Sequence, residues 1–305
     1  MSLITLFTIT IPFLLNALLG VGQEMVKAVE TESLLPLRVI SLPLGISILP
    51  IQRQGVTPPL VEARSAVVID KDSGHILYQK EAGASLEPAS LTKLMTALVV
   101  IEQVPLDRVV TVPKEATQVG GSRMHLLAGE RIRAEGLLKG TLIASANDAA
   151  YALALETAGS IPAFARLMNQ KASSLGLIKS YFTNPHGLSN SQHKSSALDI
   201  AFLTKEALNH PLISQMLGTK EAVVYDVSGH FSHHLQNTNK LIGRYENIIG
   251  GKTGTLSSGE SLVSAAKGTN DQVVIAAVLD SPDRFAETSL LLDWALKSYI
   301  WIGKL

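Results

Sequence analysis

The chain contains no cysteine among its 305 residues, which excludes a disulfide-stabilised scaffold, thiol catalysis and any metal site built on thiolates. Charged residues are also scarce. They make up 17% of the chain, whereas a soluble domain usually carries roughly 25%. The 26 basic and 26 acidic residues cancel, so the sequence lacks the basic excess that an electrostatic nucleic-acid binder needs. We therefore expect no nucleic-acid partner.

The scarce charge is distributed unevenly, since no side chain in residues 1–23 is charged. This apolar run is about 20 residues long, enough to cross the hydrocarbon core of a bilayer as a helix. Residues 1–22 are therefore interpreted either as a signal peptide or as a retained N-terminal membrane anchor. The basic residues that usually open such segments are missing, so the choice stays open. Both interpretations predict export, with the protein periplasmic or at the outer face of the cytoplasmic membrane, and retention would add membrane contact through the N-terminus.

A second apolar stretch, residues 34–51, is interrupted by prolines and an arginine, which argues against a second membrane helix. Residues 52–59 are largely polar and end in two prolines. We interpret residues 23–61 as an extended connector and residues 62–305 as the main folded domain.

Strand-like runs occur at both ends of this domain, and helical periodicity fills the middle. Short runs of β-branched residues bounded by turn residues predict strands at 66–70, 75–78, 222–227, 251–255, 261–267 and 273–279. Apolar residues at helical spacing predict a helix that begins near 90 and further helices at 137–143, 149–158, 161–175, 197–209 and 288–299. The sequence therefore predicts one α/β domain whose sheet joins the N- and C-terminal segments, with an all-helical insert between them.

A Ser-x-x-Lys box, Ser90 to Lys93, lies at the start of the first predicted helix. Residues three apart share one face of a helix, so the lysine amine can reach the serine hydroxyl. A serine hydroxyl needs a neighbouring base to become a nucleophile, and a buried lysine with a lowered pKa can be that base. Taken alone the box is weak evidence, because a helix cap with an exposed lysine also fits it.

Two further boxes follow, Ser-Ala-Asn at 145–147 between two predicted helices and Lys-Thr-Gly at 252–254 on a predicted strand. Each has an ordinary interpretation as a loop or a turn. Their order is distinctive, because Ser-x-x-Lys, Ser-x-Asn and Lys-Thr-Gly together resemble the boxes of penicillin-interacting serine enzymes. Ser-x-x-Lys also occurs at Ser191 and Ser264, but only Ser90 precedes both other boxes.

Beyond the boxes, the chain resembles the low-molecular-weight D-alanyl-D-alanine carboxypeptidases over about residues 66–295. The run Pro-Ala-Ser-Leu-Thr-Lys-Leu-Met-Thr at 88–96 is the most specific match. Shorter matches lie at 121–124, 145–150, 168–169, 175–176, 184–188 and 237–239. The resemblance implies an α/β fold of the β-lactamase and transpeptidase type, with an antiparallel sheet and an all-helical subdomain, in which residues 62–305 form the catalytic domain.

The resemblance also implies roles for the reactive side chains. Ser90 would attack the carbonyl between the two D-alanines of a peptidoglycan stem peptide, and Lys93 would accept its proton. Ser145 would pass a proton to the leaving amine, and the backbone N–H groups of Ser90 and Thr255 would form the oxyanion hole. β-Lactam antibiotics would acylate Ser90 as covalent inhibitors. No metal or cofactor is expected.

The remaining box residues would bind the substrate. Asn147 would hold the substrate amide, and Lys252 would bind the terminal carboxylate while its charge keeps Lys93 neutral. Further hydroxyl or strand-edge contacts would come from Thr253, Gly254 and Thr255.

Three other functions fit the same boxes to different degrees. A DD-endopeptidase that cleaves peptidoglycan cross-links cannot be separated from a carboxypeptidase by sequence. A class A β-lactamase needs a glutamate between the second and third boxes, whereas residues 171–198 contain no acid and Tyr181 and Phe182 occupy its usual place. An inactive module that binds cell wall or senses β-lactams is the third, which the complete set of reactive side chains disfavours.

Two local features lie outside this scheme. After the third box the chain reads Leu-Ser-Ser-Gly at 256–259, where the family often has an aromatic residue or histidine, so the substrate preference stays open. His230, His233 and His234 lie close together, but no carboxylate or thiol spacing supports a metal site. We expect a polar surface loop there, and a structural role for His186 in its Asn-Pro-His-Gly turn.

Overall fold

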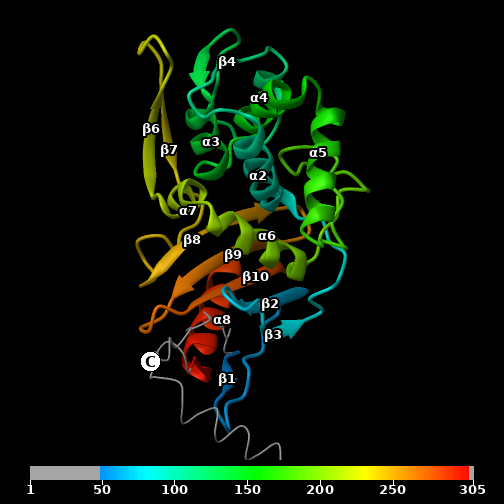
Figure 1. The fold of residues 1–305 in the computed structure, drawn as a ribbon, viewed down its shortest axis with the longest axis vertical. Coiled ribbons are helices and arrows are strands. Elements are labelled where there is room, and N and C mark those ends of the chain that lie inside the picture. The colour runs from blue at the N-terminus through cyan, green and yellow to red at the C-terminus, as the bar shows by residue number, and fades with distance from the viewer. Residues whose placement is uncertain (1–48, 302–305) are drawn as a thin grey trace, which may run out of the picture. The chain divides into compact units, whose positions relative to one another are not determined.

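Strands from both ends of the described chain form one central sheet, in the middle of Figure 1. The computed structural model describes residues 49–301, so the predicted segment 1–22 and most of the predicted connector lie outside the described residues. Every neighbouring pair of strands in this sheet is antiparallel. The order across it is β3 (Ile76–Lys80), β2 (Ser65–Asp70), β10 (Val273–Ser281), β9 (Glu260–Lys267) and β8 (Ile248–Thr255). The predicted α/β fold with an antiparallel sheet is confirmed.

The sheet separates two hydrophobic cores, because successive side chains of a strand point to opposite faces. In β2, Val67 and Ile69 enter one core, whereas Ala66 and Val68 enter the other. Helix α8 (Arg284–Ser298) packs in the second core, and the larger first core lies among the remaining helices. Burial on both faces explains why β2 and the middle of β10 are continuous apolar runs.

The larger core is formed mainly by helices, which lie above the sheet in Figure 1. Ser160 and Ser196 cap the two helices that follow them, since each hydroxyl accepts a hydrogen bond from a backbone N–H. Gly159 ends another helix with a φ of 71°, a conformation that glycine adopts at little cost. The helical segments are η1 (Ala89–Thr92), α2 (Lys93–Gln103), η2 (Ala116–Gln118), α3 (Ala134–Leu142), α4 (Asn147–Ala158), α5 (Ile161–Ser174), α6 (Ala197–Asn209) and α7 (Pro211–Gly218).

The predicted all-helical insert also contains two short antiparallel pairs. They are β4 (Val109–Thr111) with β5 (Arg131–Arg133), and β6 (Glu221–Tyr225) with β7 (Ser232–Gln236). Strand β7 corrects our prediction of a polar surface loop around His233. Exposed and buried residues alternate along β7, and the His233 side chain is among the buried ones. The loop prediction was wrong because two adjacent histidines hide the alternation of buried and exposed positions that marks a strand with one buried face.

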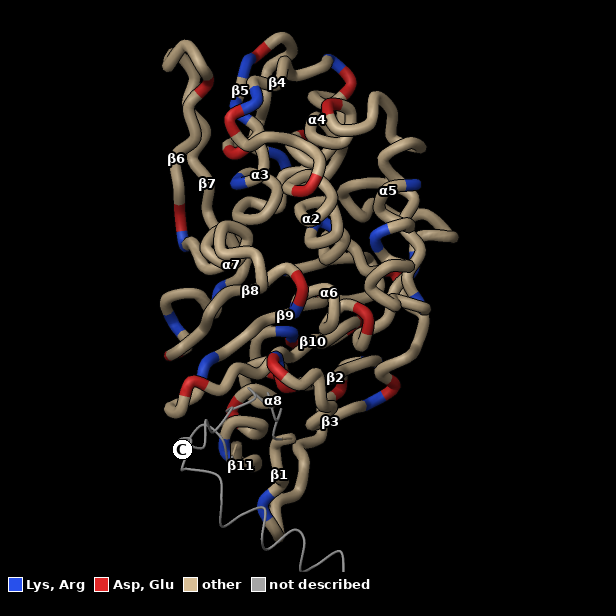
Figure 2. Tube along the Cα trace, in the orientation of Figure 1, with Lys and Arg blue, Asp and Glu red and all other residues tan. Residues whose placement is uncertain are grey.

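The last residues of the predicted connector pack on the folded domain. Strand β1 (Ile51–Gln52) pairs with β11 (Tyr299–Ile300). Val61 is buried in the second core, and Trp294 Nε1 donates a hydrogen bond to the Thr57 carbonyl at 3.0 Å. Within residues 49–301, no helix combines the length and apolarity needed to span a membrane. Basic and acidic residues are interspersed over the described fold (Figure 2).

Candidate active site

Ser90 and Lys93 lie where the chain enters the central helix α2. Ser90 is in η1 and Lys93 is the first residue of α2, so the predicted spacing of three residues brings the side chains together. Lys93 Nζ lies 2.8 Å from Ser90 Oγ. Ser90 is half-buried, whereas Lys93 is completely buried. The hydroxyl therefore borders solvent and the amine lies beneath it.

The partners of Lys93 show how this amine can act as a base. Its Nζ donates hydrogen bonds to Asn147 Oδ1 at 2.6 Å and to the His186 carbonyl at 2.9 Å. Both of these oxygens can only accept hydrogen bonds. A neutral amine carries two N–H donors and one lone pair, so engaging both donors leaves the lone pair for the Ser90 hydroxyl. This geometry suits proton transfer from Ser90 Oγ to Lys93 Nζ.

Burial and two cations in succession influence the charge state of Lys93. Burial and then the positive charge of Lys252 lower the pKa of Lys93 well below its ordinary value of 10.5, although the Asp148 carboxylate opposes the shift. Burial and then the positive charge of Arg284 lower the pKa of Lys252 to about 7. The guanidinium of Arg284 stays protonated at any working pH. Its charge therefore favours the neutral form of Lys252.

Ser145 and Lys252 connect the second and third boxes. Lys252 Nζ donates hydrogen bonds to Ser145 Oγ at 2.9 Å and to the Thr253 carbonyl at 3.1 Å. Thr253 Oγ1 in turn lies 2.6 Å from Thr238 Oγ1. Ser145 has a φ of 58°, a left-handed conformation that costs a residue with a side chain about 1–3 kcal/mol. The surrounding contacts thus hold the serine hydroxyl in one direction against local strain.

Asn147 connects the base to the rim of the site. Its Oδ1 accepts the hydrogen bond from Lys93, and its Nδ2 donates to the Gly120 carbonyl at 2.6 Å. The backbone N–H of Asn147 donates to the Ser122 carbonyl at 2.7 Å. The side chain therefore orients Lys93 and anchors the loop at 120–122. The second N–H of Nδ2 remains for the substrate amide that we predicted as its partner.

The Asn-Pro-His-Gly turn supplies the third partner of Lys93 through its backbone. Asn184 Oδ1 accepts a hydrogen bond from the Gly187 N–H at 2.7 Å, which fixes the turn. A Cβ at Gly187 would lie 1.8 Å from the Ala89 carbonyl oxygen, and the φ of 82° also favours glycine. Burial, and then the charge of Lys93, lower the pKa of His186 to about 3. A neutral imidazole and a structural carbonyl fit the role predicted for His186.

The structure brings all the predicted site residues to one cleft of about 370 Å³. Lys93 and Lys252 lie buried beneath the cleft. The Lys93 amine is hydrogen-bonded to the Ser90 hydroxyl, and the Lys252 amine is hydrogen-bonded to the Ser145 hydroxyl. No acidic residue lines the cleft within the part of the chain that the structure describes. The predicted residues that line it directly are Ser90, Ser145, Asn147, Thr253, Gly254 and Thr255.

Arg284 also lines the cleft, and the sequence boxes did not predict it. Its Nη1 donates hydrogen bonds to the Gly254 carbonyl and to Thr255 Oγ1, both at 2.8 Å, and its Nε lies 3.5 Å from Glu260 Oε2. The cleft thus combines a fixed guanidinium with two buried amines. An anionic group in the ligand is the complement of such a surface.

A serine hydroxyl beside a buried amine of lowered pKa, with a second Ser–Lys pair opposite, is the arrangement that the three boxes form in the class of penicillin-interacting serine enzymes. The comparison with protein families agrees. The chain belongs to the peptidase S11 family, described as D-alanyl-D-alanine carboxypeptidase, whose model matches residues 52–283.

Individual relatives extend this finding. The chain is 36% identical over 246 residues to D-alanyl-D-alanine carboxypeptidase DacF of Bacillus subtilis, an alignment that covers 78% of this chain and 63% of the relative. It is 34% identical over 237 residues to a D-alanyl-D-alanine endopeptidase of Pseudomonas aeruginosa, an alignment that covers 75% of this chain and 76% of the relative. The crystal structure of a Mycobacterium tuberculosis D-alanyl-D-alanine carboxypeptidase superposes with a TM-score of 0.75 at 28% identity, covering 81% of this chain and 96% of that one.

Proposed function

We propose that this protein is a serine-type D-alanyl-D-alanine carboxypeptidase that removes the terminal D-alanine from peptidoglycan stem peptides, outside the cytoplasm. The observation that carries the proposal is the 2.8 Å contact between Ser90 Oγ and the buried, pKa-lowered amine of Lys93. Family membership supports the same chemistry. The absence of an acid among the described residues of the cleft argues against a class A β-lactamase.

The reaction follows from the contacts around Ser90. As Ser90 Oγ attacks the carbonyl carbon between the D-alanines, its proton passes to Lys93 Nζ. Charge develops on the carbonyl oxygen, and backbone N–H groups of Ser90 and Thr255 stabilise it. Collapse breaks the C–N bond, and Ser145 relays the proton from Lys93 to the leaving amine, so free D-alanine departs and Lys93 is neutral again. Water then attacks the acyl-enzyme carbonyl and gives one proton to Lys93. Lys93 passes that proton to Ser90 Oγ as the ester bond breaks, which releases the shortened peptide and restores both side chains.

Recognition of the terminal carboxylate is assigned to the cationic end of the cleft. The protonated Lys252 and the fixed guanidinium of Arg284 attract an anion there. Of the hydrogen-bonded hydroxyls of Thr238 and Thr253, the one that accepts from the other can donate to it. Charge-assisted hydrogen bonds of this kind are about twice as strong as neutral ones. A substrate without the carboxylate therefore binds less favourably.

Labelling with a fluorescent penicillin tests the nucleophile. We expect the full chain to be labelled covalently and Ser90→Ala to lose labelling, because no other oxygen takes the place of Ser90 Oγ. Lys93→Ala should slow acylation by at least about 100-fold, the usual contribution of a general base. Ser191→Ala is the matched control, since Ser191 starts another Ser-x-x-Lys run but is exposed. Labelling of Ser90→Ala at the original rate would contradict the proposal.

A DD-endopeptidase is the second candidate, favoured by the similarity to the Pseudomonas aeruginosa endopeptidase. The same side chains serve both reactions, since only the group attached to the leaving amine differs. Product analysis on a pentapeptide and on a cross-linked dimer separates the two. Released D-alanine identifies a carboxypeptidase, whereas separated stem peptides identify an endopeptidase. An inactive module would give neither product.

A further inference from the structure

A pocket of about 480 Å³ lies at the tip of the hairpin formed by β6 and β7, next to β5. It is lined by residues 127–131 and by Asp226, Val227, Ser228 and Phe231 of the hairpin, and we call it the tip pocket. Figure 1 shows this hairpin beside the helical layer, with its tip near β4. The volume falls within the roughly 300–1,000 Å³ of small-ligand sites. The mechanism proposed above uses none of these residues.

Three large apolar side chains of the tip pocket are exposed to solvent. Leu127 is 50% exposed, Phe231 47% and Val227 45%. Single exposed apolar residues are ordinary on a protein surface, whereas a cluster of them around one concave site marks a place of binding. The tip pocket therefore complements a ligand that has an apolar face.

The two acids of the tip pocket are engaged by protein partners. Glu130 Oε1 lies 2.7 Å from His233 Nε2. Asp226 Oδ1 accepts a hydrogen bond from the Phe231 N–H at 2.9 Å, and its Oδ2 accepts from the Ser228 N–H at 3.0 Å and from the Ser228 hydroxyl. Within residues 49–301, no group of acids and histidines could hold a metal ion. A neutral ligand therefore fits this pocket better than a cation does.

Backbone hydrogen bonds hold the walls of the tip pocket together. The Val227 N–H donates to the Arg131 carbonyl at 2.7 Å, which fastens the hairpin to β5. The Asp226 N–H donates to the Phe231 carbonyl at 3.1 Å, which closes the turn between the strands. A pocket preorganised in this way binds a ligand with little loss of conformational freedom.

Strand β7 connects the tip pocket to the catalytic cleft. Phe231 precedes β7 and lines the pocket, whereas Thr238 follows β7 and lines the cleft. The chain takes 238 − 231 = 7 steps between them, which is about 20 Å at roughly 3.3 Å per residue. Thr238 Oγ1 lies 2.6 Å from Thr253 Oγ1, so β7 reaches the cleft at the end assigned to the terminal carboxylate.

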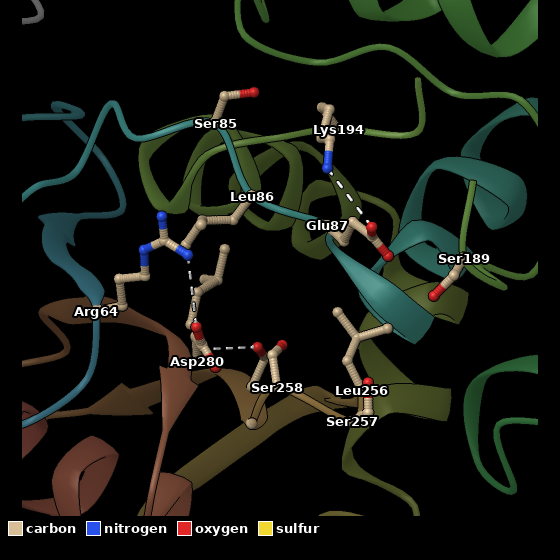
Figure 3. A pocket seen from close by; sticks show the side chains of 13 residues that line it. Arg64, Ser85, Leu86, Glu87, Ser189, Lys194, Leu256, Ser257, Ser258 and Asp280 are labelled. Atoms are coloured by element: carbon tan, nitrogen blue, oxygen red, sulfur yellow. Dashed lines mark hydrogen bonds and ion pairs between the residues drawn. The ribbon is translucent and has the colours of Figure 1, made fainter. Parts of the chain in front are cut away.

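The two ends of the cleft receive different parts of the substrate. An extended peptide can pair with β8, the edge strand of the sheet. Lys252 and Thr253 precede Thr255 along β8, whereas Leu256 and Ser257 follow it and border the cavity in Figure 3. A stem peptide whose carboxylate lies at Lys252 therefore has its acyl part at the Leu256 end. Whatever is attached to the leaving amine lies at the Lys252 end, from which β7 leads to the tip pocket.

In a cross-linked substrate the leaving amine belongs to a neighbouring stem peptide, which continues to its own glycan strand. An extended side chain and about three residues of that stem span roughly 15 Å. This reach is similar to the length of β7 between the cleft and the tip pocket. The glycan strand of the neighbouring stem can therefore lie against the hairpin while the cross-link occupies the cleft.

We propose that the tip pocket binds an amino-sugar ring of the glycan strand that carries this neighbouring stem peptide. A sugar ring has an apolar C–H face, which packs on Phe231, Leu127 and Val227. Its hydroxyl and amide groups are neutral, so they need no free charge in the pocket. The inference rests on the proposed function, because it concerns the cross-linked form of the same polymer. It gives the hairpin a part in substrate selection that the three boxes do not contain.

The first test measures binding of peptide-free glycan chains to the full-length protein by isothermal titration calorimetry. We expect saturable binding, and Phe231→Ser and Leu127→Ser should each weaken it about two- to tenfold, the range that one aromatic contact supplies. Leu290→Ser is the matched variant, since Leu290 on α8 is also 47% exposed and should not affect binding. Penicillin labelling of Ser90 should keep its rate in all three variants, which shows that they fold.

The second test compares two substrates, insoluble cross-linked peptidoglycan and a soluble pentapeptide. Phe231→Ser and Leu127→Ser should slow product release from the cross-linked polymer several-fold and leave kcat/KM for the pentapeptide unchanged, because neither side chain lines the cleft. A loss that is equal on both substrates would point to a damaged cleft and would overturn the proposal.

No binding of glycan chains by the wild type, or binding that survives both variants, would also overturn it. A concentration-dependent dimer that Phe231→Ser abolishes, measured by sedimentation, would assign the tip pocket to a second copy of the chain instead. Glycan binding is measured without turnover, whereas failure to label Ser90 or to hydrolyse either substrate would overturn the proposed function. The two failures are therefore distinguishable.

Discussion

At the scale of single residues, the site depends on cations placed in series. Arg284 lowers the pKa of Lys252, and Lys252 lowers the pKa of Lys93. Burial is the larger cause for both lysines, and the neighbouring charge adds to it. The arrangement favours the neutral form of the Lys93 amine next to Ser90, and among the described residues no acid lines the cleft. A charge change at Arg284 should therefore alter the pH dependence of the reaction.

Arg284→Gln should move the alkaline limit of activity to higher pH. Lys252 carries its positive charge below a pKa of about 7 and loses it above that pH, so recognition of the substrate carboxylate weakens as pH rises. Removing the guanidinium raises the pKa of Lys252, and the decline in kcat/KM should begin about one pH unit later. The profile of kcat/KM against pH measures this shift, because it reports the pKa values of groups in the free enzyme.

The control is Arg284→Lys, which keeps the positive charge and should therefore retain the original alkaline limit. A profile unchanged in Arg284→Gln would refute the coupling.

The contact between Ser90 and Lys93, the proposed nucleophile and base, could be predicted from sequence, whereas the position of Arg284 could not. Ser90 and Lys93 belong to one turn of helix, so their spacing alone predicts the contact. Arg284 lies 284 − 252 = 32 residues beyond Lys252 and carries no motif. Pairing of β8, β9 and β10 returns the chain to the cleft before Arg284 begins α8. Such a contact depends on the register of the whole sheet.

At the scale of helices and strands, local signals predicted some boundaries well. Helix α6 was predicted at 197–209 and occupies Ala197–Asn209, because Ser196 caps its start. Helix α7 and strand β7 were missed. The strand carries adjacent histidines at 233 and 234, and only the tertiary structure buries one and exposes the other. Burial of a polar side chain depends on a distant partner, which local patterning does not contain.

That partner is Glu130, and its contact with His233 connects β7 to the rim of the site. His233 Nε2 lies 2.7 Å from Glu130 Oε1, and His233 Nδ1 lies 2.8 Å from the Met124 carbonyl. A carbonyl only accepts, so Nδ1 carries a proton and donates to it. Nε2 and the carboxylate then share another proton. The pair holds the segment that follows Ser122, whose carbonyl positions Asn147.

His233→Phe should destabilise the fold by about 3–5 kcal/mol, since it leaves the Glu130 carboxylate buried without its partner. Urea unfolding measures the loss, and penicillin acylation should slow as the loop at 120–126 loses an anchor. The double variant Glu130→Leu with His233→Phe should recover most of the stability, because the buried charge is removed with its partner. A double variant no more stable than His233→Phe would show that the cost lies elsewhere, in packing.

At the scale of the whole molecule, catalysis and stability oppose each other. The sheet carries Lys252 on β8 and the helical layer carries Lys93 on α2, and both side chains are buried between them. A buried lysine with a lowered pKa is charged more readily in the unfolded chain than in the fold. Burying the positive form therefore lowers the free energy of unfolding, whereas burying a neutral side chain of similar size does not carry this cost. Proteins commonly accept such a cost at an active site.

Lys252→Met should therefore raise global stability while it abolishes turnover of carboxylate-bearing peptides. Below a pKa of about 7 the folded wild type must hold a buried charge, and between about 7 and the ordinary value of 10.5 the unfolded chain binds a proton that the folded chain lacks. Wild-type stability from this group thus rises with pH through that window. The variant should be more stable than the wild type by about 1–3 kcal/mol at pH 6, and this difference should shrink towards pH 10.

Urea unfolding at several pH values measures the difference in stability. The control variant Lys297→Met, which removes an exposed lysine, should show no such difference. A stability difference independent of pH would contradict the burial of charge at Lys252.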